Sequence, residues 1–269
     1  MPEAAAAPVV HPTAVVQPGA ELGPGVEIGP WCVVEAGVVL GAGVRLTAHV
    51  HLLGRTEIGA GTVIRTGSVI GGEPQDRSYA GERTRVRIGA RCSLHEHVTV
   101  HRATGEGETV VGDEVVMMAG SHVGHNARLG HGCVLVNCAS LAGHSVVGDG
   151  AILSAYAAVH QFGRIGRLAL LGGASMATLD VPPFSIATGS YPLRWRGPNT
   201  VGLRRAGFPA EERDAIRAAL QRLFASGESP RREAESLQES PHAAVRELAE
   251  FVLSSRRGVC TAPSTPSSR

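Results

Sequence analysis

The fold of this chain is decided by residues 26–46, which read VEIGPWCVVEAGVVLGAGVRL. An aliphatic residue recurs there every six positions, at Ile28, Val34, Leu40 and Leu46. A small or β-branched residue follows each of them four positions later. Neither an α-helix, with a period of about 3.6, nor an ordinary strand, with a period of about 2, produces this spacing. We therefore expect a parallel β-helix with three faces per coil, in which residues 18 apart are neighbours.

The six-residue period extends well beyond this stretch and is interrupted twice. It holds from about residue 9 to residue 71, and a second long run lies between residues 111 and 177. The two interruptions, residues 71–87 and 103–110, have the glycine and charged residues that are typical of loops. The first loop keeps the six-residue phase, so we expect it to replace one coil of the β-helix.

Three parts follow from this pattern. We expect the β-helix to occupy residues 1–183, because Pro182 and Pro183 cannot donate to a strand ladder. Residues 184–258 should form a small α-helical C-terminal domain, and residues 259–269 should be a disordered tail.

The C-terminal domain has two predicted helices, which would cap the open end of the β-helix. The first begins at Pro209 and runs to Phe224, with acidic residues in its first turn and an apolar face. The second is expected over residues 242–256, and residues 184–206 are expected to be irregular.

Composition excludes several classes of protein. Only 4% of the 269 residues are aromatic although 43% are hydrophobic, which suits a narrow core of stacked aliphatic side chains. The net charge of +1 gives no indication of nucleic-acid binding. The five cysteines include no CxxC pair, so neither a disulfide framework nor a metal site is indicated by them. The N-terminus lacks a signal peptide, and no apolar stretch approaches 18 residues, so we expect a cytoplasmic protein without stable membrane insertion.

Histidines gather on successive coils of the second run. Val123, Leu141 and Val159 are equivalent residues, and coils stack about 4.8 Å apart. Six polar or small residues fall within a short arc around these positions: His122, His125, Gly143, His144, His160 and Gln161. A solvated face rich in histidine by chance is the plain alternative. The cluster favours acid–base catalysis, because imidazole titrates near neutrality, and it also allows a metal site of neutral imidazoles.

These histidines lie in motifs that resemble, in a consistent order, those of the UDP-N-acetylglucosamine O-acyltransferases. The motifs are HPTAVVQPGA (11–20), QDRSYAGERTRVRIG (75–89), VTVHRAT (98–104), SHVGHN (121–126), LAGH (141–144), AVHQF (158–162) and DVPPF (180–184). A single hexapeptide is unspecific, whereas this ordered set is highly specific. The resemblance covers roughly residues 9–227.

The resemblance implies a left-handed parallel β-helix that forms a homotrimer, with active sites between adjacent subunits. It implies transfer of a 3-hydroxyacyl chain from acyl carrier protein to the glucosamine 3-hydroxyl of a UDP-sugar, UDP-N-acetylglucosamine, in lipid A biosynthesis. It implies no cofactor and no metal, and no covalent acyl-enzyme.

The resemblance also assigns roles to residues. His125 matches the general base and Gly143 the backbone donor to the oxyanion. Substrate-binding positions are matched by Asp76, His122, His144, His160, Gln161, Asn199 and Arg205. Gly173 matches the acyl-chain ruler, where a missing side chain is associated with longer acyl chains.

The chain departs from the family's usual pattern at four positions. Asn126 stands where an aspartate commonly orients the base, although the related N-acyltransferase of the same pathway has a similar His-Asn pair. Ser78 replaces a loop lysine, Val201 a nucleotide-contacting glutamate, and Ala206 a basic residue. These departures leave open a modified acceptor, such as a 3-amino sugar, or a paralogue with another nucleotide sugar.

Two further alternatives remain beside acyl transfer. One is a zinc enzyme similar to carbonic anhydrase, with His122, His125 and His144 as ligands. The other is a β-helix that serves only as a recognition scaffold. The C-terminal third favours acyl transfer, because its many arginines would attract a small acidic acyl carrier protein.

Overall fold

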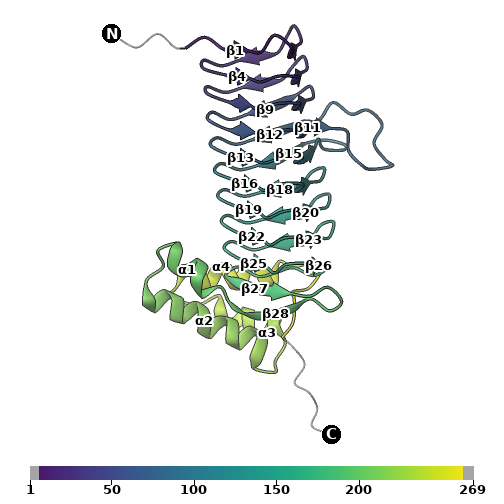
Figure 1. The fold of residues 1–269 in the computed structure, drawn as a ribbon. Helices are drawn as coiled ribbons and strands as arrows, with labels where there is room; N and C mark the ends of the chain where they lie inside the picture. The colour runs from purple at the N-terminus through teal and green to yellow at the C-terminus, as the bar shows by residue number, and fades with distance from the viewer. Residues whose placement is uncertain (1–5, 263–269) are drawn as a thin grey trace.

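The computed structural model describes residues 6–262 and contains a tall three-sided β-helix that is closed at one end by helices (Figure 1). Each coil contributes one short strand to each of three sheets, and nearly all strand pairs are parallel. The predicted three-faced parallel β-helix is therefore confirmed.

The first sheet has 11 strands. In spatial order they are β1 (Val9–Val10), β4 (Glu27–Ile28), β7 (Arg45–Leu46), β10 (Val63–Ile64), β13 (Ser93–Leu94), β16 (Val116–Met117), β19 (Val134–Leu135), β22 (Ile152–Leu153), β25 (Leu170–Leu171), β27 (Ser185–Thr188) and β28 (Arg194–Pro198). The second sheet has nine: β2 (Val15–Val16), β5 (Val33–Val34), β8 (His51–Leu52), β11 (Val69–Gly72), β14 (Thr99–His101), β17 (His122–Val123), β20 (Ser140–Leu141), β23 (Ala158–Val159) and β26 (Met176–Ala177).

The third sheet has eight strands. They are β3 (Glu21–Leu22), β6 (Val39–Leu40), β9 (Thr56–Ile58), β12 (Arg85–Ile88), β15 (Glu108–Val111), β18 (Arg128–Leu129), β21 (Val146–Val147) and β24 (Arg164–Ile165). The second residue of most two-residue strands points inward, and from Ile28 onward these residues form one continuous buried core. Stacked aliphatic side chains thus fill the interior, as the low aromatic content requires.

Both loops leave the β-helix at the corner between the second and third sheets. The predicted replacement of a coil by residues 71–87 is wrong, because β12 returns directly beside β9, with Ile88 paired to Ile58. The loop is instead inserted within one coil, and strand partners across it, such as Val63 and Ser93, are 30 residues apart. The second insertion lies at the same corner of the next coil, where residues 102–107 connect β14 to β15, and β15 includes the last three residues of the predicted loop 103–110. Two loops therefore stack above the turn that carries His125.

The C-terminal part contains four helices among the described residues: α1 (Thr200–Arg205), α2 (Ala210–Ala225), α3 (Pro230–Leu237) and α4 (Ala243–Leu253). Helices α2 and α4 confirm the two predicted helices. The prediction of an irregular segment over 184–206 is wrong, because β27 adds in parallel to β25 and β28 pairs with β27 in antiparallel fashion. The first sheet thus continues two strands beyond Pro183.

Residues 254–262 form a strap that folds back on the last coils. Val259 pairs with Asp180, and Thr261 pairs with Arg194. The Ser255 hydroxyl donates to the buried Asp180 carboxylate at 2.8 Å. The prediction of a disordered tail is therefore wrong for residues 259–262, and its remainder lies outside the described residues. Between residues 6 and 262 no helix has the length and apolarity to cross a membrane, and the cytoplasmic location stays a prediction.

Candidate active site

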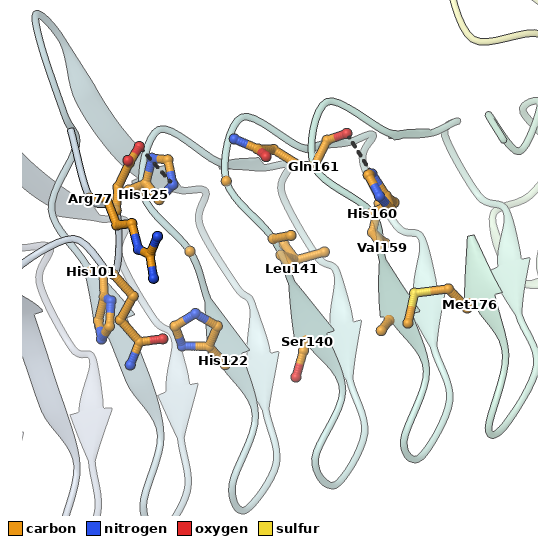
Figure 2. Close-up of a pocket in the computed structure, with 16 residues that line it drawn as sticks. Arg77, His101, His122, His125, Ser140, Leu141, Val159, His160, Gln161 and Met176 are labelled. Carbon is orange, nitrogen blue, oxygen red and sulfur yellow. Dashed lines mark hydrogen bonds and ion pairs between the residues drawn. The ribbon is translucent and has the colours of Figure 1, made fainter. Parts of the chain in front are cut away.

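A cavity of about 710 Å³ opens on the outer face of the second sheet, beside its corner with the third (Figure 2). Loop 71–87 bounds one end with Asp76 and Arg77, and β26 bounds the other with Met176. His101, His122 and His125 lie at the end near the loop, whereas His160 lies at the other end beside Val159 and Met176, which make that end more apolar (Figure 2). The cavity therefore offers both polar groups and an apolar wall to a ligand.

The predicted convergence of the histidine cluster is confirmed. Val123 pairs with Leu141, and Leu141 pairs with Val159, so the 18-residue spacing holds in this part of the chain. His122, His125, Gly143, His160 and Gln161 all line the cavity. The His144 ring lies directly behind, with its centroid 5.2 Å from that of His125 in an edge-on arrangement. Phe162 stacks on the other side of His144 at 4.7 Å.

His125 is held with one ring nitrogen directed at the cavity. Its side chain is only 9% exposed, and its Nδ1 lies 2.9 Å from Asn126 Oδ1. An amide oxygen can only accept, so Nδ1 must carry the hydrogen and donate it. Nε2 of a neutral ring then has a free lone pair, which is what a general base requires. Nε2 faces Asp76 Oδ2 across 3.8 Å.

Gly143 gives His125 the room that it needs. A Cβ atom at Gly143 would lie within 2.3 Å of His125 Nε2, so any side chain would displace the ring. The Gly143 N–H donates to no acceptor among residues 6–262, and the residue is buried beside the ring. A free N–H next to a free imidazole lone pair is the pair of groups that an acyl-transfer site uses.

Asp76 is held in place by Ser78, one of the four residues that depart from the family pattern. Its Oδ1 accepts both the backbone N–H and the hydroxyl of Ser78, each at 2.9 Å. These hydrogen bonds lower the pKa of the Asp76 carboxyl, so it is an anion at neutral pH. The other oxygen, Oδ2, stays directed at His125.

His101, His122 and His144 are electrically neutral at neutral pH. Burial lowers the pKa of His122 to about 4, and the nearby His101 adds a smaller shift in the same direction. Burial also lowers the pKa values of His101 and His144. His122 Nδ1 shares a hydrogen bond with Thr99 Oγ1 at 2.8 Å, and its ring meets His101 edge-on at 4.9 Å. These rings can orient a ligand by hydrogen bonding rather than by charge.

Several residues that line the cavity were not predicted from the sequence as site residues, among them His101, Arg77 and Met176. His101 follows Val100 as His160 follows Val159, but the insertion of residues 103–110 breaks the 18-residue spacing between them. Thr99 pairs with His122, 23 residues further on. A count that allowed for the insertion would have found His101.

Three predicted site residues lie away from this cavity within the protomer. Asn199 caps α1, accepting from Gly202 N at 3.0 Å and donating to Leu168 O at 2.8 Å, so both ends of its amide are engaged. Arg205 is exposed at the end of α1, and Gly173 lies at the corner between the first and second sheets. Their predicted contacts with substrate stay predictions.

No metal site is formed by the described side chains of one protomer. Within residues 6–262, no three His, Cys, Asp or Glu side chains are placed to hold a metal ion. The alternative of a zinc site and the prediction of a reaction without metal or cofactor both remain untested predictions.

Comparisons with protein families agree with the geometry. Residues 7–42 match the bacterial transferase hexapeptide family, and residues 180–260 match the family described as UDP-N-acetylglucosamine O-acyltransferase, domain 2. An acyl-[acyl-carrier-protein]–UDP-N-acetylglucosamine O-acyltransferase from Xylella fastidiosa is 38% identical over 194 residues, which cover 70% of this chain and 73% of the relative. The enzyme of the same name from Paracoccus denitrificans is 44% identical over 187 residues, which cover 68% of this chain and 70% of the relative.

Solved structures extend the similarity to nearly the whole chain. A UDP-N-acetylglucosamine acyltransferase from Francisella novicida superposes with a TM-score of 0.91 at 32% identity, covering 95% of each chain. One from Bacteroides fragilis gives a TM-score of 0.89 at 34% identity, covering 93% of this chain and 99% of that one. The predicted left-handed parallel β-helix with a small α-helical C-terminal domain is confirmed.

Proposed function

Because the chain belongs to the UDP-N-acetylglucosamine O-acyltransferase family, we propose that it moves a 3-hydroxyacyl chain from acyl carrier protein to the glucosamine 3-hydroxyl of UDP-N-acetylglucosamine. The observation that carries this proposal is the pairing of the free Nε2 of His125 with the free N–H of Gly143. A thioester is already activated, so one base and one oxyanion donor suffice for its attack by an alcohol.

The chemical step begins when His125 Nε2 takes the proton of the sugar hydroxyl as that oxygen attacks the thioester carbonyl carbon. The C–O bond forms, and the carbonyl oxygen becomes an oxyanion that the Gly143 N–H stabilises. The C–S bond then breaks, and the imidazolium returns the proton to the departing thiolate. Atoms and charge balance: one ester and one free thiol are formed from one alcohol and one thioester.

Asp76 has a role on the same side of the ring. Its carboxylate lies 3.8 Å from His125 Nε2, where it favours the imidazolium that forms during the step. The neutral His101, His122 and His144 can orient sugar and phosphate oxygens without adding charge near the base. We assign His160 and Gln161 to the more apolar end of the same cavity, where they would contact the bound substrates.

A homotrimer fits the outer surface of the first sheet. Its outward residues over five adjacent strands are aliphatic and half-buried: Val116, Val134, Ile152, Leu170 and Ile186. The outward residues of the third sheet are largely charged, such as Arg87, Arg128 and Arg164. An aliphatic ladder of this kind is expected to pack on a neighbouring subunit, which would bring further side chains to the cavity.

The experiment uses the purified protein with a mixed pool of acyl carrier protein thioesters and either UDP-N-acetylglucosamine or its 3-amino analogue. Mass spectrometry should detect an O-acylated nucleotide sugar that carries a 3-hydroxyacyl chain. His125→Ala should lower the rate by about 10²- to 10⁴-fold, the usual contribution of a general base. His49→Ala, at an exposed histidine on another corner, is the matched control and should leave the rate unchanged.

Two outcomes contradict the proposal. Acylated product from neither acceptor would overturn the assignment to nucleotide-sugar acylation. Product from the 3-amino analogue alone would replace the hydroxyl acceptor by an amine, with the same base and oxyanion donor.

A further inference from the structure

We propose that the short loop 103–110 forms a binding site, here called the seat, for the neutral side-chain amide of Asn126. The seat fixes which ring nitrogen of His125 carries the hydrogen, and it disfavours a carboxylate at position 126. Asn126 and Thr104 are thereby positioning residues rather than catalytic ones. The rate measurements below rest on the proposed function, whereas the measurement of ring protonation does not.

Both ends of the short loop hold Asn126. At its start, the Thr104 N–H and the Thr104 hydroxyl donate to Asn126 Oδ1, at 2.9 and 3.1 Å. Asn126 Nδ2 in turn donates to the Thr104 carbonyl at 3.1 Å. At the end of the loop, the buried Thr109 hydroxyl accepts the Asn126 backbone N–H at 2.8 Å. The side chain thus has one orientation in which all its contacts are satisfied.

This orientation reaches His125 through one oxygen. Asn126 Oδ1 receives the His125 Nδ1–H at 2.9 Å in addition to its two contacts from Thr104. A flipped amide would place its NH2 against the Thr104 N–H and against His125 Nδ1–H, donor against donor. The loop therefore keeps the ring in the form with hydrogen on Nδ1 and leaves Nε2 free.

A carboxylate does not fit the same seat. Thr104 presents donors to one side of the amide and its own carbonyl oxygen to the other. An ionised carboxylate would set its second oxygen against that carbonyl, with no hydrogen between two acceptors. Such a contact is costly in a half-buried place, because a polar atom loses its partner and meets a like partial charge.

The absence of an anion at position 126 is offset on the opposite side of the ring. Asp76 Oδ2 lies 3.8 Å from Nε2, so the negative charge faces the nitrogen that gains the proton. The titratable and charged groups in and beside the cavity around His125 are Asp76, Arg77, His101, His122, His144 and His160. Asp76 is the only anion among these six.

The test is Asn126→Asp, which gives this chain the aspartate that is common in the family. We expect kcat to fall at least about tenfold at neutral pH with KM nearly unchanged, because the loss concerns the base and not ligand binding. The deficit relative to wild type should shrink as the pH is lowered, since a protonated carboxyl can donate to the Thr104 carbonyl. An Asn126→Asp variant as active as wild type at neutral pH, or more active, would overturn the proposal.

Thr104→Val is the graded comparison. It removes one of the two donors to Asn126 Oδ1 and keeps both backbone contacts, so we expect a smaller loss of kcat than with Asn126→Asp. A larger loss from Thr104→Val than from Asn126→Asp would contradict the seat, because the variant that keeps more contacts would be the worse one.

Ring protonation can be measured without any substrate. Nitrogen-15 NMR of the imidazole of His125, assigned by comparison with His125→Ala, should show hydrogen on Nδ1 in the wild type above its titration range. Asn126→Ala should give a mixture of both ring forms. Hydrogen on Nε2 in the wild type would overturn the seat even if the enzyme proves to use another acceptor, and the wild-type spectrum decides the matter if Asn126→Asp does not fold.

Discussion

The two insertions, loop 71–87 and loop 103–110, leave the β-helix at the same corner of consecutive coils, yet they serve His125 in opposite ways. The long loop projects from the body of the β-helix and returns to bound the cavity (Figure 1). It places Asp76 on the Nε2 side of the ring, whereas the short loop holds Asn126 on the Nδ1 side. Each loop therefore acts on a different nitrogen of the same imidazole, and the two insertions together turn one corner of a regular coil into a site.

Of the changes to the two loops, removing the negative charge of Asp76 in the long loop should have the largest effect on the rate. Asp76→Asn keeps the side-chain shape but loses the anion 3.8 Å from His125 Nε2. We expect kcat/KM to fall by about 10- to 100-fold, because the imidazolium formed in the step loses its counter-charge. Steady-state kinetics measures this, with Ser78→Ala as the control that keeps the carboxylate and removes one of its hydrogen bonds. A change below about twofold in Asp76→Asn would show that the long loop does not act on the base.

Removing the contacts that Arg102 makes to the long loop should have a smaller effect, on KM rather than on kcat. Arg102 donates to the Tyr79 hydroxyl at 2.7 Å, to the Gly71 carbonyl at 3.1 Å and to Glu73 at 3.1 Å. Arg102→Gln loses most of these contacts, so we expect KM to rise by roughly three- to tenfold with kcat almost unchanged. Arg102→Lys should recover part of the loss. If kcat fell instead, with KM unchanged, the long loop would share the role of the short one.

The smallest effect is expected at His122, which lies on the second sheet and belongs to neither loop. Its folded-state pKa of about 4 is below the ordinary value of 6.5, so the unfolded chain binds a proton that the folded chain does not. Stability from this group is complete above pH 6.5 and is lost as the pH falls toward 4. His122→Gln should therefore give a melting temperature that declines less steeply over this range, measured by thermal unfolding from pH 7.5 to 4 as compared with the exposed control His131→Gln. Equal slopes in wild type and His122→Gln would contradict this.

Much of the fold could be predicted from the sequence, because the six-residue period fixes which side chains point inward. The same period placed His122, His125 and His160 together, since Val123, Leu141 and Val159 stack in register. The prediction failed where the period is interrupted. An inserted loop has no period of its own. Asp76 was therefore assigned to substrate binding only by the resemblance, and neither its place opposite His125 nor the contact of Thr104 with Asn126 was predicted.

The C-terminal errors have a related cause. Strands β27 and β28 lack the six-residue spacing, and their place is set by the open edge of β25 that they cover. The strap is short and rich in serine and arginine, a composition typical of disorder. It is ordered by partners that are distant in sequence, such as the buried Asp180 carboxylate, which no local pattern could reveal.

The strap also follows, in the order of synthesis, the coils that it holds beside the site. Arg257 donates to the carbonyl groups of Gln161 at 3.0 Å and Thr178 at 3.2 Å, on the coils that bound the cavity. A ribosome delivers the coils in order from the N-terminus, and each can stack on the one before it. Arg257 is synthesised 96 residues after Gln161. The coils that carry the histidines can therefore stack before Arg257 is available to hold the turn that carries Gln161.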